Sequence, residues 1–141
     1  MEDLVSIAMA ARPLETLPQG ALRLTRGSLA SAQLITARGE LDAQTARTLV
    51  DVVDDVARSH TALIVDLGPL AFFGTEGLWA LNRIRAACAK HHVSVAIVAG
   101  PEVRRVLRVC DPHGALGVVT TLDDAASALT VGASGCSAPA L

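Results

Sequence analysis

The chain has 141 residues, 51% of them hydrophobic and 18% charged, which suits one globular domain with a buried core. A net charge of −2 disfavours a general nucleic-acid binder, because binding to phosphates requires an excess of basic side chains. No apolar run is long enough to cross a bilayer, and the three cysteines match no zinc-binding spacing. We therefore expect a cytoplasmic protein without a membrane, metal or nucleic-acid partner.

Residues 1–19 are expected to form an N-terminal extension that is helical or irregular. Its apolar stretch, Leu4–Ala11, follows two acidic residues, whereas a secretory signal requires positive charge there. The domain is predicted to span residues 20–130. The Gly-, Ser-, Ala- and Pro-rich residues 131–141 are predicted to form a flexible tail.

Two short strands open the predicted domain. Leu22–Thr25 alternates apolar and polar residues, and Gln33–Ala37 is rich in residues that favour strands. Arg26–Ser28 contains a glycine and is expected to form the turn between them. The two strands are therefore predicted to pair antiparallel.

A helix is predicted after Asp42, a residue type that caps helix N-termini. On its exposed side, Arg47 with Asp51 and Asp54 with Arg58 are spaced for ion pairs. The residues expected to face the core recur at helical spacing: Ala46, Leu49, Val50, Val53, Val56 and Ala57.

Two nearly continuous apolar runs, Ala62–Leu67 and Val93–Val98, predict strands that are buried on both faces. A helix from about Glu76 to His91 is expected between them. Its predicted inward residues are Gly77, Leu81, Ile84 and Cys88.

A third helix is predicted to begin at Pro101, because proline suits the first helical turn, and to end before Pro112. Its inward residues are expected to be Val103, Val106, Leu107 and Cys110. Val118–Thr120 is predicted to be a last short strand. Thr121 is expected to cap a final helix, with Asp124 at its third position.

The predicted order of elements is β-β-α-β-α-β-α-β-α. Strands that alternate with helices after an initial hairpin are typical of an α/β fold. We therefore expect a mixed, mostly parallel sheet of about five strands with about four helices.

Common catalytic and cofactor motifs are missing from the sequence. It contains no glycine-rich nucleotide loop, so neither a dinucleotide enzyme nor a P-loop enzyme is indicated. A response-regulator receiver needs an acidic cluster that holds Mg²⁺ and a lysine after a later strand. Here Asp66 has no acidic neighbours and Lys90 precedes the predicted strand Val93–Val98, which argues against a receiver. We predict no catalytic residues, no cofactor and no metal ligands. Cys88 and Cys110 are expected to be buried inert thiols, with a redox pair between them left open.

Two segments carry a family resemblance. Gly39–Asp42 reads Gly-Glu-Leu-Asp at the end of the second predicted strand, and Phe72–Leu78 reads Phe-Phe-Gly-Thr-Glu-Gly-Leu before a helix. Together with Asp66 at the end of the next strand, these segments resemble the STAS domain of bacterial anti-sigma factor antagonists. The resemblance covers about Leu22 to Ala128 and implies the STAS fold.

The resemblance also implies that Thr75 is a phosphorylation site. The family motif carries an aspartate where this chain has Gly74 and a small residue where it has Glu76. The alternative is that Thr75 only caps the helix, its hydroxyl accepting a hydrogen bond from the backbone of Gly77 or Leu78.

The partner implied by the resemblance is a cytoplasmic anti-sigma factor, typically a serine/threonine kinase, whose capture releases a sigma factor. The residues expected to bind it are Asp42, Gly74, Thr75, Glu76, Gly77, Leu78, Trp79 and Arg83. Trp79 is the only tryptophan, and the alternative is that it lies flat over a neighbouring helix. An interaction or scaffold module without phosphorylation control, a small-ligand sensor and a homodimer also stay open.

Overall fold

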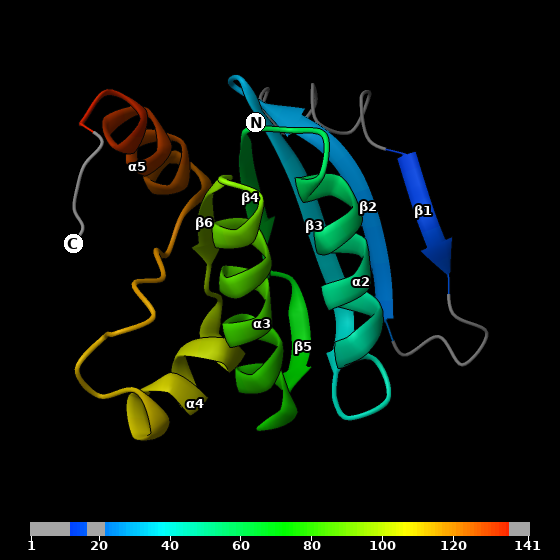
Figure 1. The fold of residues 1–141 in the computed structure, drawn as a ribbon. Coiled ribbons are helices and arrows are strands. Elements are labelled where there is room, and N and C mark those ends of the chain that lie inside the picture. Colours follow the sequence, from blue (N-terminus) through cyan, green and yellow to red (C-terminus); the bar gives the residue numbers. More distant parts are fainter. Residues whose placement is uncertain (1–11, 17–21, 136–141) are drawn as a thin grey trace.

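The computed structural model describes residues 12–16 and 22–135, so the stretch Leu4–Ala11 and residues 136–141 lie outside the described residues. The described part is a six-stranded sheet with four helices, which confirms the expected α/β class and number of helices (Figure 1). The elements are β1 (Arg12–Thr16), β2 (Leu22–Leu29), β3 (Ala32–Leu41), α2 (Ala46–Ala57), β4 (Ala62–Asp66), β5 (Leu70–Phe73), α3 (Glu76–Lys90), β6 (Ser94–Val98), α4 (Pro101–Cys110) and α5 (Leu122–Gly135).

The sheet is mixed, in the order β1-β2-β3-β4-β6. β2 pairs antiparallel with both of its neighbours, whereas β3, β4 and β6 run parallel. β3 changes partner along its length: Gln33–Thr36 pairs with β4, and Gly39–Leu41 pairs with β5. The short β5 therefore continues the sheet beside β3 where β4 has ended.

The hairpin between β2 and β3 is confirmed, but its turn lies further along the chain than expected. Gly27 pairs with Leu34 inside the ladder, and the turn is formed by Ala30 and Ser31. Ala30 adopts a positive φ of 57°, which a two-residue hairpin loop requires. The prediction of a turn at Arg26–Ser28 is wrong because that glycine belongs to an uninterrupted strand.

Three further differences concern short elements. Arg12–Thr16, expected to lie in an irregular extension, pairs with β2 as an edge strand. The strand predicted at Val118–Thr120 is reduced to one bridge between Val98 and Val119. The strand β5 was not predicted, and α5 continues to Gly135, beyond the expected start of the tail.

Apolar side chains fill both faces of the central strands. Ile64 and Val65 are neighbours on β4 that face opposite sides, and both are fully buried. On Val65's side, α2 and α3 pack side by side across the sheet, while α5 covers Ile64's side near β6 (Figure 1). Burying one such side chain stabilises the fold by about 1.5–3 kcal/mol. The predicted layered core is therefore confirmed.

The start of α5 is confirmed in detail. The hydroxyl Oγ1 of Thr121 accepts a hydrogen bond from the backbone N–H of Asp124 at 3.0 Å. This bond satisfies one of the N–H groups that the first helical turn leaves without a partner.

Candidate functional site

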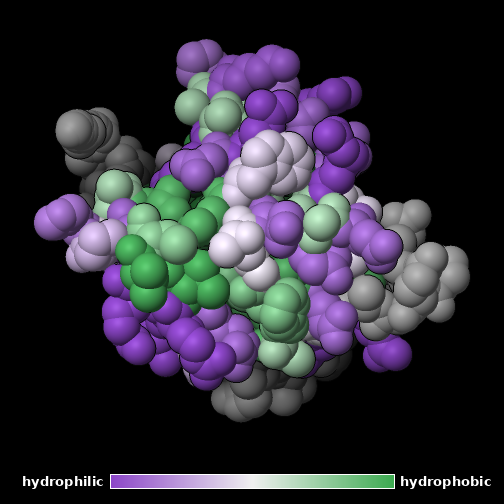
Figure 2. Space-filling model, turned by 90° about the horizontal axis from the view of Figure 1, so that it is seen from below, coloured by the Kyte–Doolittle hydropathy of each residue, from purple (hydrophilic) through white to green (hydrophobic). Residues whose placement is uncertain are grey.

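The ends of β3 and β5 bring two predicted loops together at the carboxyl edge of the sheet. The backbone N–H of Gly74 donates to the carbonyl of Leu41 at 2.9 Å, which ties the turn before α3 to the end of β3. Asp42 and Thr75 each follow directly after this junction. Figure 2 views the molecule from this edge and shows an apolar area left of centre, with hydrophilic residues around it.

Thr75 is exposed at the N-terminus of α3. Its backbone is helical, with φ −65° and ψ −23°, and its side chain forms no capping hydrogen bond. A capping side chain normally requires an extended backbone at this position, which explains the missing bond. The expectation that the Thr75 hydroxyl accepts a bond from Gly77 or Leu78 is therefore wrong. The hydroxyl is not used to hold the helix end.

Gly74 and Glu76 are coupled in space. A Cβ atom added at Gly74 would lie 2.9 Å from Oε1 of Glu76 and 3.1 Å from Cε2 of Phe72. The Glu76 carboxylate thus fills the space beside position 74. The two departures from the family motif are therefore coupled, because the Glu76 carboxylate lies where a side chain at position 74 would begin.

Gly77 is buried, and its role is close packing. A Cβ atom there would lie 2.3 Å from Cε1 of Phe73, far inside van der Waals contact. The expected inward orientation of Gly77 is confirmed, whereas its expected contact with a partner stays a prediction. Leu78 is half-buried against the main core, so only part of it is available to a partner.

Asp42 lies in a network of hydrogen bonds at the start of α2. Its Oδ1 accepts the backbone N–H groups of Gln44 and Thr45 at 3.0 and 3.1 Å. The helix begins at Ala46, after a turn, so Asp42 caps the turn that precedes α2 and not the helix itself. The buried Thr45 completes the network: its Oγ1 accepts from the N–H of Asp42 at 3.0 Å and donates to the carbonyl of Glu40 at 2.9 Å.

Two arginines lie close to the ring of Trp79. The guanidinium carbon of Arg47, from α2, is 5.6 Å from the centre of its ring, and that of Arg83, from α3, is 5.8 Å away. Both distances fall within the range of cation–π attraction. Trp79 is still 40% exposed, so the arginines do not cover it. Arg47 thus lies against Trp79, where an ion pair with Asp51 was expected, while the Asp54–Arg58 pair is present at 3.1 Å.

Asp66 closes β4 at the same edge of the sheet. It is half-buried, and its Oδ1 accepts the backbone N–H of Gly68 at 2.9 Å. Desolvation raises the pKa of Asp66, while the bond from Gly68 and the charge of Arg38 act against this rise. The carboxylate therefore stabilises the turn between β4 and β5 through this hydrogen bond, but it loses part of its hydration.

The two described cysteines differ in environment. Both are free thiols; Cys88 is fully buried and Cys110 is exposed at the end of α4. Desolvation raises the pKa of Cys88 to about 11, which makes its thiol a poor nucleophile. The prediction that Cys110 is buried is wrong. No disulfide joins the pair.

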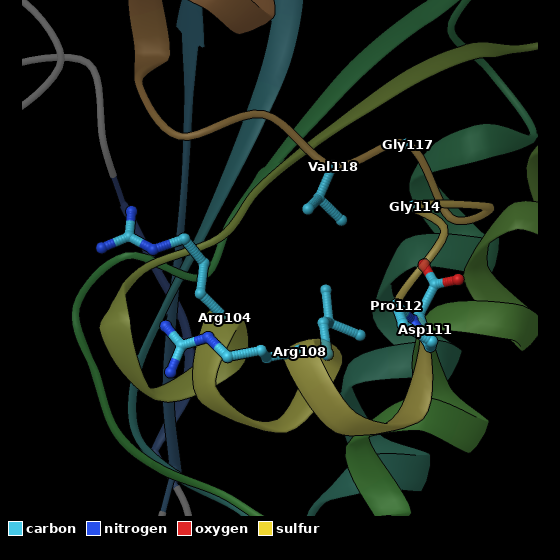
Figure 3. Close-up of a pocket in the computed structure, with 8 residues that line it drawn as sticks. Arg104, Arg108, Asp111, Pro112, Gly114, Gly117 and Val118 are labelled. Carbon is cyan, nitrogen blue, oxygen red and sulfur yellow. The ribbon is translucent and has the colours of Figure 1, made fainter.

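A separate cleft lies between α4 and the loop that follows it (Figure 3). It has a volume of about 580 Å³, with Arg104 and Arg108 at one end and Asp111 at the other. The Asp111 carboxylate accepts the N–H groups of Ala115 and Leu116 at 2.8 and 2.9 Å, so it holds its own loop. None of the residues predicted to bind a partner lines this cleft.

Two residues of the carboxyl edge were not predicted. Thr45 could have been found from the sequence, because it follows Asp42 by three residues. At this spacing, each of two polar side chains can accept a hydrogen bond from the backbone N–H of the other. Arg47 has none, since Asp51 offered it a partner within its own helix. In the part of the chain that the structure describes, no helix could cross a membrane and no cluster of His, Cys, Asp or Glu could hold a metal ion.

Comparisons with known proteins agree on one family. A family model described as STAS domain matches residues 29–125. The anti-sigma-F factor antagonist RsfA of Mycobacterium tuberculosis is 34% identical over 112 residues, which are 77% of this chain and 88% of the relative.

Solved structures extend the similarity to the fold. The crystal structure of an anti-sigma factor antagonist from Mycobacterium paratuberculosis has a TM-score of 0.69 at 27% identity, covering 82% of this chain and 99% of that chain. The anti-sigma factor antagonist SpoIIAA, in its unphosphorylated form, has a TM-score of 0.59 at 16% identity, covering 76% of this chain and 96% of that chain. The second similarity concerns the fold alone.

Proposed function

The chain belongs to the STAS domain family, and we propose that it is an anti-sigma factor antagonist controlled by phosphorylation of Thr75. In this function it binds an anti-sigma factor that is also a serine/threonine kinase, and so releases a sigma factor. The kinase supplies ATP and the phosphoryl group. This domain supplies a hydroxyl and a docking surface, and does no chemistry of its own.

The observation that carries the proposal is that Thr75 is exposed and its hydroxyl forms no capping bond. A kinase could therefore modify this residue without breaking the start of α3. The helix N-terminus also favours a negative group by about 0.3–1 kcal/mol per charge. Phosphorylation is therefore compatible with the fold, and the unmodified hydroxyl is accessible to a partner.

The phosphoryl group would act on binding and not on folding. It adds a charge of about −1.5 to −2 at the rim that Asp42 and Thr75 share. A complex of micromolar affinity has about 8 kcal/mol of binding free energy, so a few kcal/mol of repulsion and dehydration suffice to release the partner. The Glu76 carboxylate beside Gly74 adds to the negative charge of the modified rim.

Calorimetric titration with the cognate anti-sigma factor tests this function. We expect Thr75→Ala to bind as the unmodified protein does, because the substitution only shortens an exposed side chain to a methyl group and adds no charge. We expect Thr75→Glu to bind at least about tenfold more weakly, because it places a permanent charge on the rim. Equal affinities for the two variants would contradict control through position 75.

Incubation with the cognate kinase and ATP, followed by an intact mass measurement, tests the modification itself. We expect the mass of one phosphoryl group on the unmodified protein and none on Thr75→Ala. If the protein binds the kinase but takes up no phosphate, the alternative of an interaction module without phosphorylation control is correct.

A further inference from the structure

Arg47, Trp79 and Arg83 form a surface on the seam between α2 and α3, which we name the Arg–Trp–Arg surface. The two guanidinium groups reach the ring from different helices, at 5.6 and 5.8 Å. All three residues are exposed. The aromatic ring thus keeps two arginine side chains in place at the molecular surface.

The charges of Arg47 and Arg83 are not neutralised by ion pairs within the described part of the protein, although carboxylates lie nearby. Asp51 and Asp54 line the same groove as Arg83, further along the helices. Asp54 is engaged by Arg58 and His91 at 3.1 and 3.2 Å. Two oriented guanidinium groups therefore remain available to an external anion.

We propose that the Arg–Trp–Arg surface docks an acidic segment of the protein partner, whose carboxylates pair with Arg47 and Arg83 while its aliphatic parts cover Trp79. Arginine holds carboxylates through paired hydrogen bonds, and tryptophan and arginine are the side chains that most often dominate binding energies. Charge complementarity thus selects an acidic occupant over a neutral or basic one.

This surface also explains how Thr75 could control docking, a step that rests on the proposed function. Thr75 precedes Trp79 by four residues, so both lie on one side of α3 about one turn apart. A phosphoryl group on Thr75 would attract the arginines that the acidic segment needs. Intramolecular competition for the same cations would then add to the direct repulsion of the partner.

Nuclear magnetic resonance tests the surface without the partner. Because Trp79 is the only tryptophan, its indole N–H gives a single signal in the ¹⁵N-labelled protein. The probe is hexaglutamate with blocked ends, and hexalysine is its control. We expect hexaglutamate to shift the indole signal saturably, and hexalysine to leave it in place.

The variant Arg47→Ala/Arg83→Ala should weaken hexaglutamate binding about tenfold or more, because both charge-assisted contacts are lost. Arg104→Ala/Arg108→Ala removes the same net charge from α4 and should bind as the unmodified protein does. Equal weakening in both double variants, or an indole signal that hexaglutamate does not move, would overturn the proposal.

The same two double variants are then titrated with the anti-sigma factor. Loss of binding in the Arg47/Arg83 variant alone supports the acidic-segment surface. Unchanged binding in that variant overturns it while the proposed function stands. Binding of hexaglutamate with no binding of any anti-sigma factor would contradict the proposed function and leave the anion-binding surface supported.

Discussion

Gly77 is a position where a single methyl group decides the packing at the start of α3. An alanine Cβ would lie 2.3 Å from the Phe73 ring, which is itself buried. We expect Gly77→Ala to lower the free energy of unfolding by about 1–3 kcal/mol, because the ring must leave its preferred position. Urea denaturation followed by circular dichroism measures this loss.

Gly74→Ala is the matched control for that substitution. Its nearest neighbours are the end of the flexible Glu76 side chain and the exposed ring of Phe72, both of which can move. We therefore expect a much smaller loss than for Gly77→Ala. Equal losses would show that the Phe73 ring moves aside as easily as the neighbours of Gly74 do, and that its contact does not require glycine at position 77.

The sequence alone could identify the residues that the family motif fixes, but not how their side chains are used. The exposure of Thr75 was predictable from its place between a strand and a helix. The missing cap was not, because it depends on a helical backbone at that residue. Likewise, Gly77 was expected both on the inward face of the helix and among the partner-binding residues. Only the position of the Phe73 ring shows why this residue has to be a glycine.

At the scale of elements, Thr45 joins β3 to α2. Its buried hydroxyl accepts from Asp42 and donates to Glu40, so Thr45→Val leaves two backbone groups without partners. We expect a loss of about 1–3 kcal/mol in the free energy of unfolding, measured by urea denaturation.

Thr45→Ser keeps the hydroxyl and removes one buried methyl group, at a cost of about 0.8 kcal/mol. We therefore expect Thr45→Ser to be more stable than Thr45→Val. The reverse order would mean that the methyl group, and not the hydrogen-bond network, stabilises this junction.

Long elements were predictable and short ones were not, for a physical reason. The helices α2 and α3 span several turns, so their buried residues repeat often enough to reveal the period. β5 has four residues, and both Ala71 and Phe72 are exposed between buried ends, which breaks the alternation of a strand. Its pairing depends on β3 ending beside it, a contact that only the assembled sheet provides.

Across the whole molecule, two carboxylates make stability depend on pH in opposite directions. Desolvation raises the pKa of Asp66. For Asp54, desolvation is the largest influence and acts upward, but hydrogen bonds from His91 and Arg58 together lower its pKa. Asp54, on α2, forms a hydrogen bond with His91 at the end of α3, whereas Asp66 is the last residue of β4. Replacing each carboxyl group on its own separates these effects.

Asp66→Asn keeps an oxygen that can accept the N–H of Gly68 but removes the charge. Because the folded-state pKa is raised, ionisation of Asp66 costs stability, and this cost develops as pH rises from the usual value of 3.8 through the folded-state pKa. We therefore expect Asp66→Asn to be more stable than the unmodified protein at pH 7, with the difference shrinking as pH falls towards 4.

Asp54→Asn should behave in the opposite way. Its stabilisation is present above the usual pKa of 3.8 and is lost as pH falls through the lowered folded-state pKa. We therefore expect Asp54→Asn to be less stable than the unmodified protein at pH 7, since the ion pair of Asp54 with Arg58 is lost and its hydrogen bond with His91 is weakened. Urea midpoints of the three proteins from pH 7 down to about pH 2, well below the usual carboxyl pKa of 3.8, measure both effects. Parallel pH profiles for all three would show that neither carboxylate controls stability, because only a difference in proton binding between folded and unfolded chains can change the slope.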